Sequence, residues 1–232
     1  MNARTVAAAA ALALVLVACA PAPLRAPPAG SPPSAAPAIE DDAYAAAARR
    51  GERVYRVDGP ASLVVVEVRR AGSLAQFGHD HVVASRTARG HVDAGGRRAD
   101  LRFRLDELTV DEPALRDEAG FTTRPSTEDI AGTRANMLER VLESDRYAEA
   151  AVRVEGREGA PFTVTLTLHG VAREIDAPVA VEVSDDAVEA SGRCELRLSD
   201  FGMAPFAILG GAIRVDDTVV VRFRIRATRL AG

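Results

Sequence analysis

After Arg53, many segments of the chain alternate apolar and polar side chains with a period close to two residues. In LRFRLDEL, Leu101, Phe103 and Leu105 alternate with charged residues, and the same spacing recurs in SLVVVEVRR, FTVTLTLH and VVVRFRIRA. This period is typical of β-strands that bury one face. Turn-rich pieces such as DGPAS, DAGGRRAD and REGAP separate the segments. The pattern predicts about eight antiparallel strands.

An open sheet of that size would expose two long edges. We therefore expect an all-β fold in which the antiparallel sheet closes into a barrel or folds into a sandwich. A barrel of about eight strands has room for a packed core or for one small ligand. The expected inner wall is mostly Val and Leu, and the chain has no Trp and only 4% aromatic residues. Such side chains would line a barrel without filling its axis, although they equally suit a solid sandwich core.

Strand parity assigns the side chains expected on the inner wall. The assignment requires unbroken alternation, because a one-residue bulge would exchange the inward and outward sets of a strand. The inward residues expected to contact a ligand are Val64, Val66, Val68, Phe103, Leu105, Val164, Leu166, Leu168, Leu196, Leu198, Val221 and Phe223. Cys194 shares a face with two of them, and we interpret it as a small buried residue rather than a reactive thiol.

The segment STEDIAGTRANMLERVLES breaks the alternation. Ser126 and Asp129 are spaced like a capping box, but Gly132 weakens the first turn, so we expect the helix to begin near Thr133. We expect this one short amphipathic helix to cover the mouth of the barrel. Its apolar residues recur at the helical spacing, at Ile130, Met137, Leu138, Val141 and Leu142.

The N-terminal segment has a different composition. Residues 1–18 are predicted to be a signal peptide, because Arg4 precedes an apolar run that ends in LVAC. This tetrapeptide resembles a bacterial lipobox, whose cysteine, here Cys19, is acylated. Residues 19–52 begin with a Pro- and Ala-rich stretch and are predicted to be a tether, which leaves 53–230 as the folded domain.

The predicted location is the bacterial cell envelope, on the periplasmic side of a membrane that holds acylated Cys19. Ala20 lacks the acidic character that retains some lipoproteins at the inner membrane, so the outer membrane is slightly favoured. An ordinary cleaved signal peptide with an incidental cysteine is the alternative.

Charge and motifs exclude several classes of function. A net charge of −4 without a concentrated basic stripe does not suit a nucleic-acid partner. The chain contains no G-x-S-x-G elbow, no H-E-x-x-H helix and no Gly-rich phosphate loop, so we expect no enzyme activity and no cofactor. The run DEPALRDE offers carboxylates, but we interpret it as a solvated loop.

Half of the histidines lie in the stretch FGHDHVV. On a strand, His79 and His81 would share one side, where two imidazoles can ligate a divalent cation. A third ligand could come from His91 or His169, but no carboxylate follows in VVASR. We therefore favour a polar cluster at the mouth of the tunnel, and a metal site at His79, His81 and His91 remains the alternative.

Four segments in this order resemble the YceI-like family of exported bacterial proteins: VYRVD, ANMLERVLESDRYAEAAVRVEG, FTVTLTLHGVAREI and LRLSDFGMAPFAILGGAIRVDDTVVVRF. They span almost the whole predicted domain. The resemblance implies a lipocalin-like barrel that binds a polyisoprenoid lipid. FGHDH and the long stretch VDEPALRDEAGFTTRPSTEDI depart from the common pattern of the family, which affects the mouth geometry and the ligand length.

The expected function is therefore to bind an apolar, chain-like lipid inside the barrel, for carriage or storage in the cell envelope. A bound isoprenoid would be the only small-molecule partner. One alternative is a metal-binding protein or metal-dependent enzyme that uses His79 and His81. A second alternative is a structural envelope lipoprotein whose core is filled.

Overall fold

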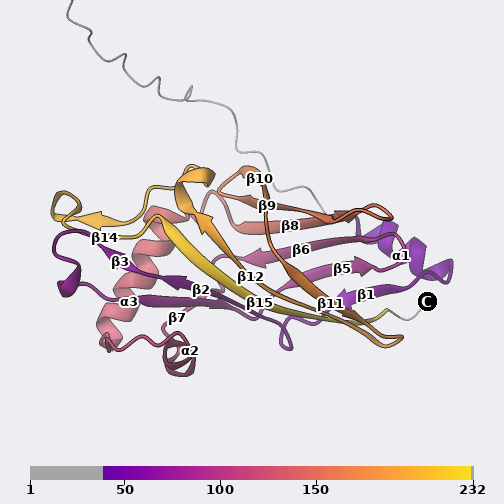
Figure 1. Ribbon diagram of the computed structural model, residues 1–232, viewed down its shortest axis with the longest axis horizontal. Coiled ribbons are helices and arrows are strands. Elements are labelled where there is room, and N and C mark those ends of the chain that lie inside the picture. Colours follow the sequence, from indigo (N-terminus) through magenta and orange to yellow (C-terminus); the bar gives the residue numbers. More distant parts are fainter. Residues whose placement is uncertain (1–38, 231–232) are drawn as a thin grey trace, which may run out of the picture. The chain divides into compact units, whose positions relative to one another are not determined.

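The computed structural model describes residues 39–230 (Figure 1). Cys19, the predicted signal peptide and the first part of the predicted tether lie outside these residues. The described chain is mostly antiparallel β-sheet with a few short helices, which confirms that part of the prediction. No helix within residues 39–230 is long and apolar enough to cross a bilayer.

Strand β15 (Thr218–Arg229) organises the main sheet. One of its edges pairs along its whole length with β12 (Ala187–Arg197), which pairs in turn with β11 (Val179–Val183). The other edge pairs first with β2 (Leu63–Val68) and then with β1 (Val54–Val57). The sheet therefore divides at this edge into two series of strands, one that starts with β1 and one that starts with β2, and we call them its two arms.

Each arm continues through antiparallel neighbours. From β1 the order is β5 (Arg89–Asp93), β6 (Arg98–Arg104), β8 (Glu149–Gly156), β9 (Phe162–Leu168) and β10 (Val171–Ile175). From β2 the order is β4 (His81–Ser85) and β7 (Thr109–Val110). A separate small sheet joins β13 (Ala207–Ile208), β14 (Ile213–Val215) and β3 (Arg70–Ala71).

The strand count differs from the prediction. The main sheet has twelve strands rather than about eight, because short edge strands such as β7 and β10 add to the long alternating ones. Within residues 39–230, no ladder joins β10 to β11 or β12, so the strand pairs do not show the closed barrel that was predicted. The 3₁₀ turn η3 (Leu198–Phe201) contacts both β10 and β12 at this gap.

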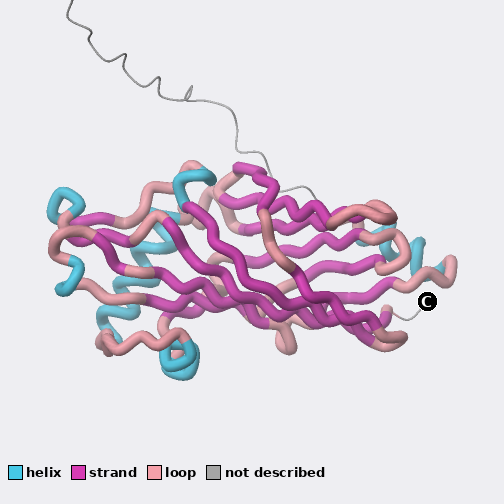
Figure 2. Tube along the Cα trace, viewed as in Figure 1, coloured by secondary structure: helices cyan, strands magenta, loops and turns pink. Residues whose placement is uncertain are grey.

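Helical segments lie at both ends of the strands (Figure 2). Helix α3 (Thr127–Asn136) continues into a π-helical turn, η2 (Met137–Val141). The capping box of Ser126 and Asp129 is confirmed, but the predicted start near Thr133 is wrong, because the helix begins directly after Ser126. Capping satisfies the first free N–H groups, and this outweighs the modest cost of a glycine in the first turns.

Helix α1 (Asp41–Arg49) lies inside the predicted tether and corrects its boundary. Tyr44 is fully buried, packs with Val54, and its hydroxyl donates a hydrogen bond of 2.9 Å to Asp100 Oδ2. The folded part of the chain therefore begins well before the predicted position 53. Tyr44 is the one aromatic residue of the helix DDAYAAAAR, and an aromatic ring buries a large apolar area.

Helix α2 (Pro113–Glu118) covers the outer face of β2 and β4. Leu115 and Phe121 pack there against Val65, Val82 and Ala84. This packing explains why LVVVEV is apolar on both faces, since each face of the strand meets apolar neighbours. The remaining turns are η1 (Ala75–Phe77) and η4 (Leu209–Gly211).

Candidate functional site

An apolar cavity of about 890 Å³ lies inside the main sheet. Side chains from both arms and from β12, β15 and α3 form its wall. All the residues that strand parity placed on the inner wall line it, which means that no bulge inverts these strands. They are Val64, Val66, Val68, Phe103, Leu105, Val164, Leu166, Leu168, Leu196, Leu198, Val221 and Phe223. Their contact with a lipid remains a prediction.

The wall is built from rows of short side chains in register. Cys194, Val221, Val66 and Val83 are consecutive cross-strand partners on four strands, and all of them line the cavity. None of these side chains is long enough to reach across the interior, so the axis stays open. Burial raises the pKa of the Cys194 thiol, which keeps it protonated as an apolar wall residue, as predicted.

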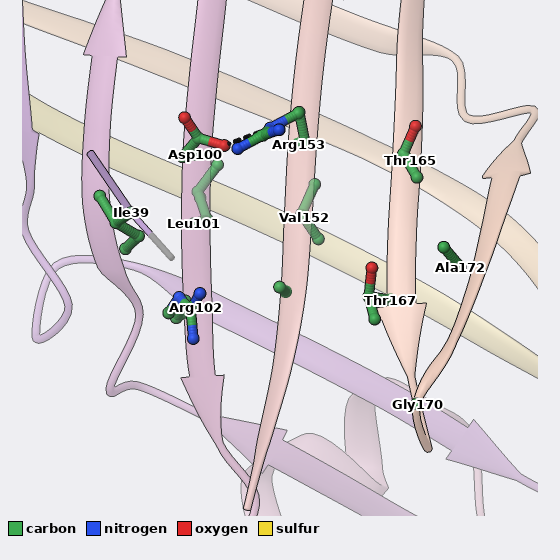
Figure 3. Close-up of a pocket in the computed structure, with 11 residues that line it drawn as sticks. Ile39, Asp100, Leu101, Arg102, Val152, Arg153, Thr165, Thr167, Gly170 and Ala172 are labelled. Atoms are coloured by element: carbon green, nitrogen blue, oxygen red, sulfur yellow. Dashed lines mark hydrogen bonds and ion pairs between the residues drawn. The ribbon is translucent and has the colours of Figure 1, made fainter. Parts of the chain in front are cut away.

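The outer face of β6, β8, β9 and β10 carries polar side chains. A groove of about 350 Å³ crosses the outside of β6, β8, β9 and β10, where Asp100 Oδ1 accepts a hydrogen bond of 2.7 Å from Arg153 Nε (Figure 3). Thr165 and Thr167 line the same groove. The period-two alternation has therefore separated an apolar inner wall from a polar exterior, and the inner cavity is the candidate site for an apolar ligand.

Helix α3 and a group of polar side chains mark one end of the cavity. Gly132, Thr133 and Asn136 of α3 line it, which places the helix at a mouth of the cavity, as expected. His79 and His81 line the same region, with their ring centroids 6.1 Å apart. The two histidines of FGHDHVV therefore face the cavity rather than the solvent side of the sheet.

His81 is held by a buried carboxylate. Its Nδ1 lies 2.6 Å from Oδ2 of Asp111, whose side chain is fully buried and whose Oδ1 also accepts a hydrogen bond of 3.0 Å from the Val82 N–H. Arg116, which is 3% exposed, donates to the same carboxylate. Burial alone would raise the pKa of Asp111, but the hydrogen bonds from His81 and Val82 outweigh it and lower that pKa.

The second end of the cavity has an apolar rim. Phe162, Val181 and Val183 line the cavity and are each more than two fifths exposed. Arg97 stacks over the ring of Phe162, with 4.5 Å between its guanidinium carbon and the ring centroid. Arg98 lines the same end. The cavity therefore extends from the end at α3 to the end formed by the start of β9 and the last residues of β11.

The comparison with protein families decides the identity of this domain. The family model for the YceI-like domain matches residues 55–227. The chain belongs to the YceI-like family. A search of curated protein sequences found no match to this chain.

Two solved structures share the fold of this YceI-like domain. A polyisoprenoid binding domain from Saccharophagus degradans, implicated in plant cell wall breakdown, has a TM-score of 0.56 at 16% identity, over 77% of this chain and 100% of that chain. BcnA from Burkholderia cenocepacia has a TM-score of 0.50 at 17% identity, over 74% of this chain and 99% of that chain. At these identities the likeness shows the fold alone.

The other histidines of the YceI-like domain do not join His79 and His81. His91 lies under α1, stacked on Tyr44 with 5.1 Å between centroids, so it joins the pair neither in the favoured polar cluster at the mouth nor in the alternative metal site. His169 lies in the turn after β9, with its ring 4.2 Å from that of Tyr147. Among residues 39–230, no group of three or more His, Cys, Asp or Glu side chains could hold a metal ion.

Sequence reasoning missed Asp111 and Arg116. We expected DEPALRDE to be a solvated loop, whereas both residues are buried, so this expectation is wrong.

Two signals in the sequence could have indicated a packed helix here. Pro113 is typical of a helix N-terminus, and the apolar side chains of Leu115 and Phe121 require a surface to cover. The identity of the buried partner, His81, could not be inferred, because the contact joins residues thirty positions apart.

Proposed function

We propose that this YceI-like domain binds an apolar, chain-like lipid of the polyisoprenoid class inside its cavity and carries or stores it without chemistry of its own. The observation that carries the proposal is the open cavity of about 890 Å³, whose wall is mostly aliphatic and aromatic. Transfer of a hydrocarbon chain from water into such a site contributes roughly 25 cal/mol per Å² of buried apolar area. The polyisoprenoid class is supported by family membership and by the similar fold of the Saccharophagus degradans domain.

We further propose that the protein acts in the bacterial cell envelope, anchored to a membrane through acylated Cys19. The apolar run before LVAC and the following Pro- and Ala-rich stretch support this location. A tethered carrier would keep its open cavity close to the membrane that supplies the lipid. The proposed closed barrel would require η3 to complete the wall between β10 and β12, where Phe201 and Met203 pack against Leu166.

The absence of tryptophan from the chain allows a direct test. Phe223→Trp would place the sole tryptophan on the cavity wall, and Arg224→Trp would place it on the exposed outer face of the same strand. We would titrate both variants, in a Cys19→Ser chain purified without detergent, with the isoprenoid hydrocarbon squalene. Saturable change in the emission of Phe223→Trp alone is expected. No change, or an equal change in both variants, would refute binding inside the cavity.

A further inference from the structure

The ring of His81 presents one open hydrogen-bonding atom. Its Nδ1 faces the buried Asp111 carboxylate at 2.6 Å, and an ionised carboxylate only accepts hydrogen bonds. Nδ1 therefore carries the proton, and in the neutral ring Nε2 carries a lone pair. The ring lines the cavity, and its side chain makes no hydrogen bond within residues 39–230 other than that to Asp111. Nε2 is thus an oriented acceptor on the wall of the cavity.

Arg116 supplies a buried positive charge beside the Asp111 carboxylate. Its guanidinium contacts Asp111 and also donates to the carbonyl oxygens of Asp80 and Thr123, so it is fixed on several sides. The charge of Asp111 is therefore already balanced by a buried cation, and it does not require a second one from His81. Asp111 also holds a left-handed backbone conformation with φ of 58°, which few residues other than glycine adopt.

The other charges at this mouth do not form a site for an anion. Arg70 forms an ion pair with Asp80, at 3.7 Å, and donates a hydrogen bond of 2.7 Å to the carbonyl oxygen of Gly78.

Arg214 lines the same end of the cavity, but Glu128 and Asp129 of α3 line it as well. The Asp129 carboxylate accepts hydrogen bonds from Ser126 that lower its pKa, so it is charged at neutral pH. Two carboxylates beside the Arg214 guanidinium oppose a phosphate and leave a neutral end group as the better partner.

We propose that His81, positioned by Asp111 and Arg116, recognises a hydroxyl group at the end of the apolar chain. The hydroxyl would donate a hydrogen bond to Nε2 while the chain extends along the valine-lined wall toward β9 and β11. The ligand class is then a long-chain isoprenoid alcohol, and neither its phosphate ester nor the bare hydrocarbon is preferred. This inference rests on the proposed function, since it concerns the end group of the same ligand.

The test compares three ligands that share one isoprenoid chain: geranylgeraniol, geranylgeranyl phosphate and the corresponding hydrocarbon without an end group. Affinity is measured with Phe223→Trp emission in the Cys19→Ser chain. The alcohol is expected to bind roughly two- to tenfold more tightly than the hydrocarbon, which is the range of one net hydrogen bond. His81→Phe should abolish that advantage and leave the hydrocarbon affinity nearly unchanged. His79→Phe, at the neighbouring histidine on the same wall, is the matched control and should retain the advantage.

The outcomes separate the inference from the proposed function. Equal binding of alcohol and hydrocarbon, tighter binding of the phosphate, or an advantage that survives His81→Phe would overturn the role of His81 and leave the lipid cavity intact. Failure of all three ligands to bind would overturn both. If His81→Phe does not fold, ¹⁵N NMR of the unsubstituted ring decides: the proton is expected on Nδ1, and geranylgeraniol should shift the Nε2 resonance. A proton on Nε2 in the free protein would refute the inference.

Discussion

At the scale of single residues, His91 is the clearest case in which burial sets a charge state. It is 8% exposed, stacked under Tyr44, with Asp41 Oδ1 3.2 Å from Nδ1. Burial lowers its pKa, partly opposed by the attraction of Asp41, so the folded state disfavours the charged ring. The neutral ring therefore supports the docking of α1.

This environment predicts a pH dependence of stability. As the pH falls below about 6.5, the unfolded chain takes up a proton at His91 before the folded chain does, so folding stability decreases. Above that pH both states are neutral at this residue and no penalty exists. His91→Gln should weaken the decrease, measured as the midpoint of thermal unfolding between about pH 7 and pH 5. An identical decrease in both proteins would show that His91 is not its source.

The sequence allowed the inner wall to be predicted residue by residue, because strand parity needs only local alternation. Val66 and Val221, for example, line the cavity as expected and are direct cross-strand partners. The burial of Asp111 and Tyr44 could not be predicted in this way, because each depends on a partner far away in the chain. A charged or alanine-rich segment carries no local sign of such a partner.

At the scale of elements, α3 links helix capping to access to the cavity. Its residues line the mouth, and the capping box of Ser126 and Asp129 fixes its N-terminus. The sequence predicted this helix and its place at the mouth, but not its first residue, because the energetic balance between a cap and Gly132 is small. The π-helical turn after Asn136 had no sequence signal.

Removal of the cap should loosen this cover. Ser126→Ala is expected to cost about 1 kcal/mol of local helix stability, because the backbone N–H of Asp129 loses its acceptor. Hydrogen exchange over residues 127–136 should become faster, and so should the dissociation of a bound isoprenoid. Ser184→Ala, in the turn before β12 at the other end of the strands, is the control and should change neither rate. Unchanged ligand dissociation despite faster exchange would show that α3 does not gate the cavity.

At the scale of the whole molecule, amino-acid composition and strand topology together determine that the interior is hollow. The arms that diverge from β15 enclose an interior whose facing side chains are mostly Val and Leu, and the chain has no Trp to fill it. The sequence pattern left a hollow barrel and a solid core equally open, because the same valines suit both. The distance between facing valines across the interior decides between a hollow barrel and a solid core, and that distance depends on the arrangement of the complete sheet.

The central claim is that an apolar chain occupies this cavity, and mass spectrometry of what copurifies with the protein tests it most directly. The Cys19→Ser chain would be purified without detergent and extracted with organic solvent, beside Val66→Trp, which places a large ring on the cavity wall. We predict an isoprenoid lipid in the extract of the first protein and its loss from the second, with folding of both verified by circular dichroism. An extract without lipid from the first protein, or equal lipid in both, would contradict the account.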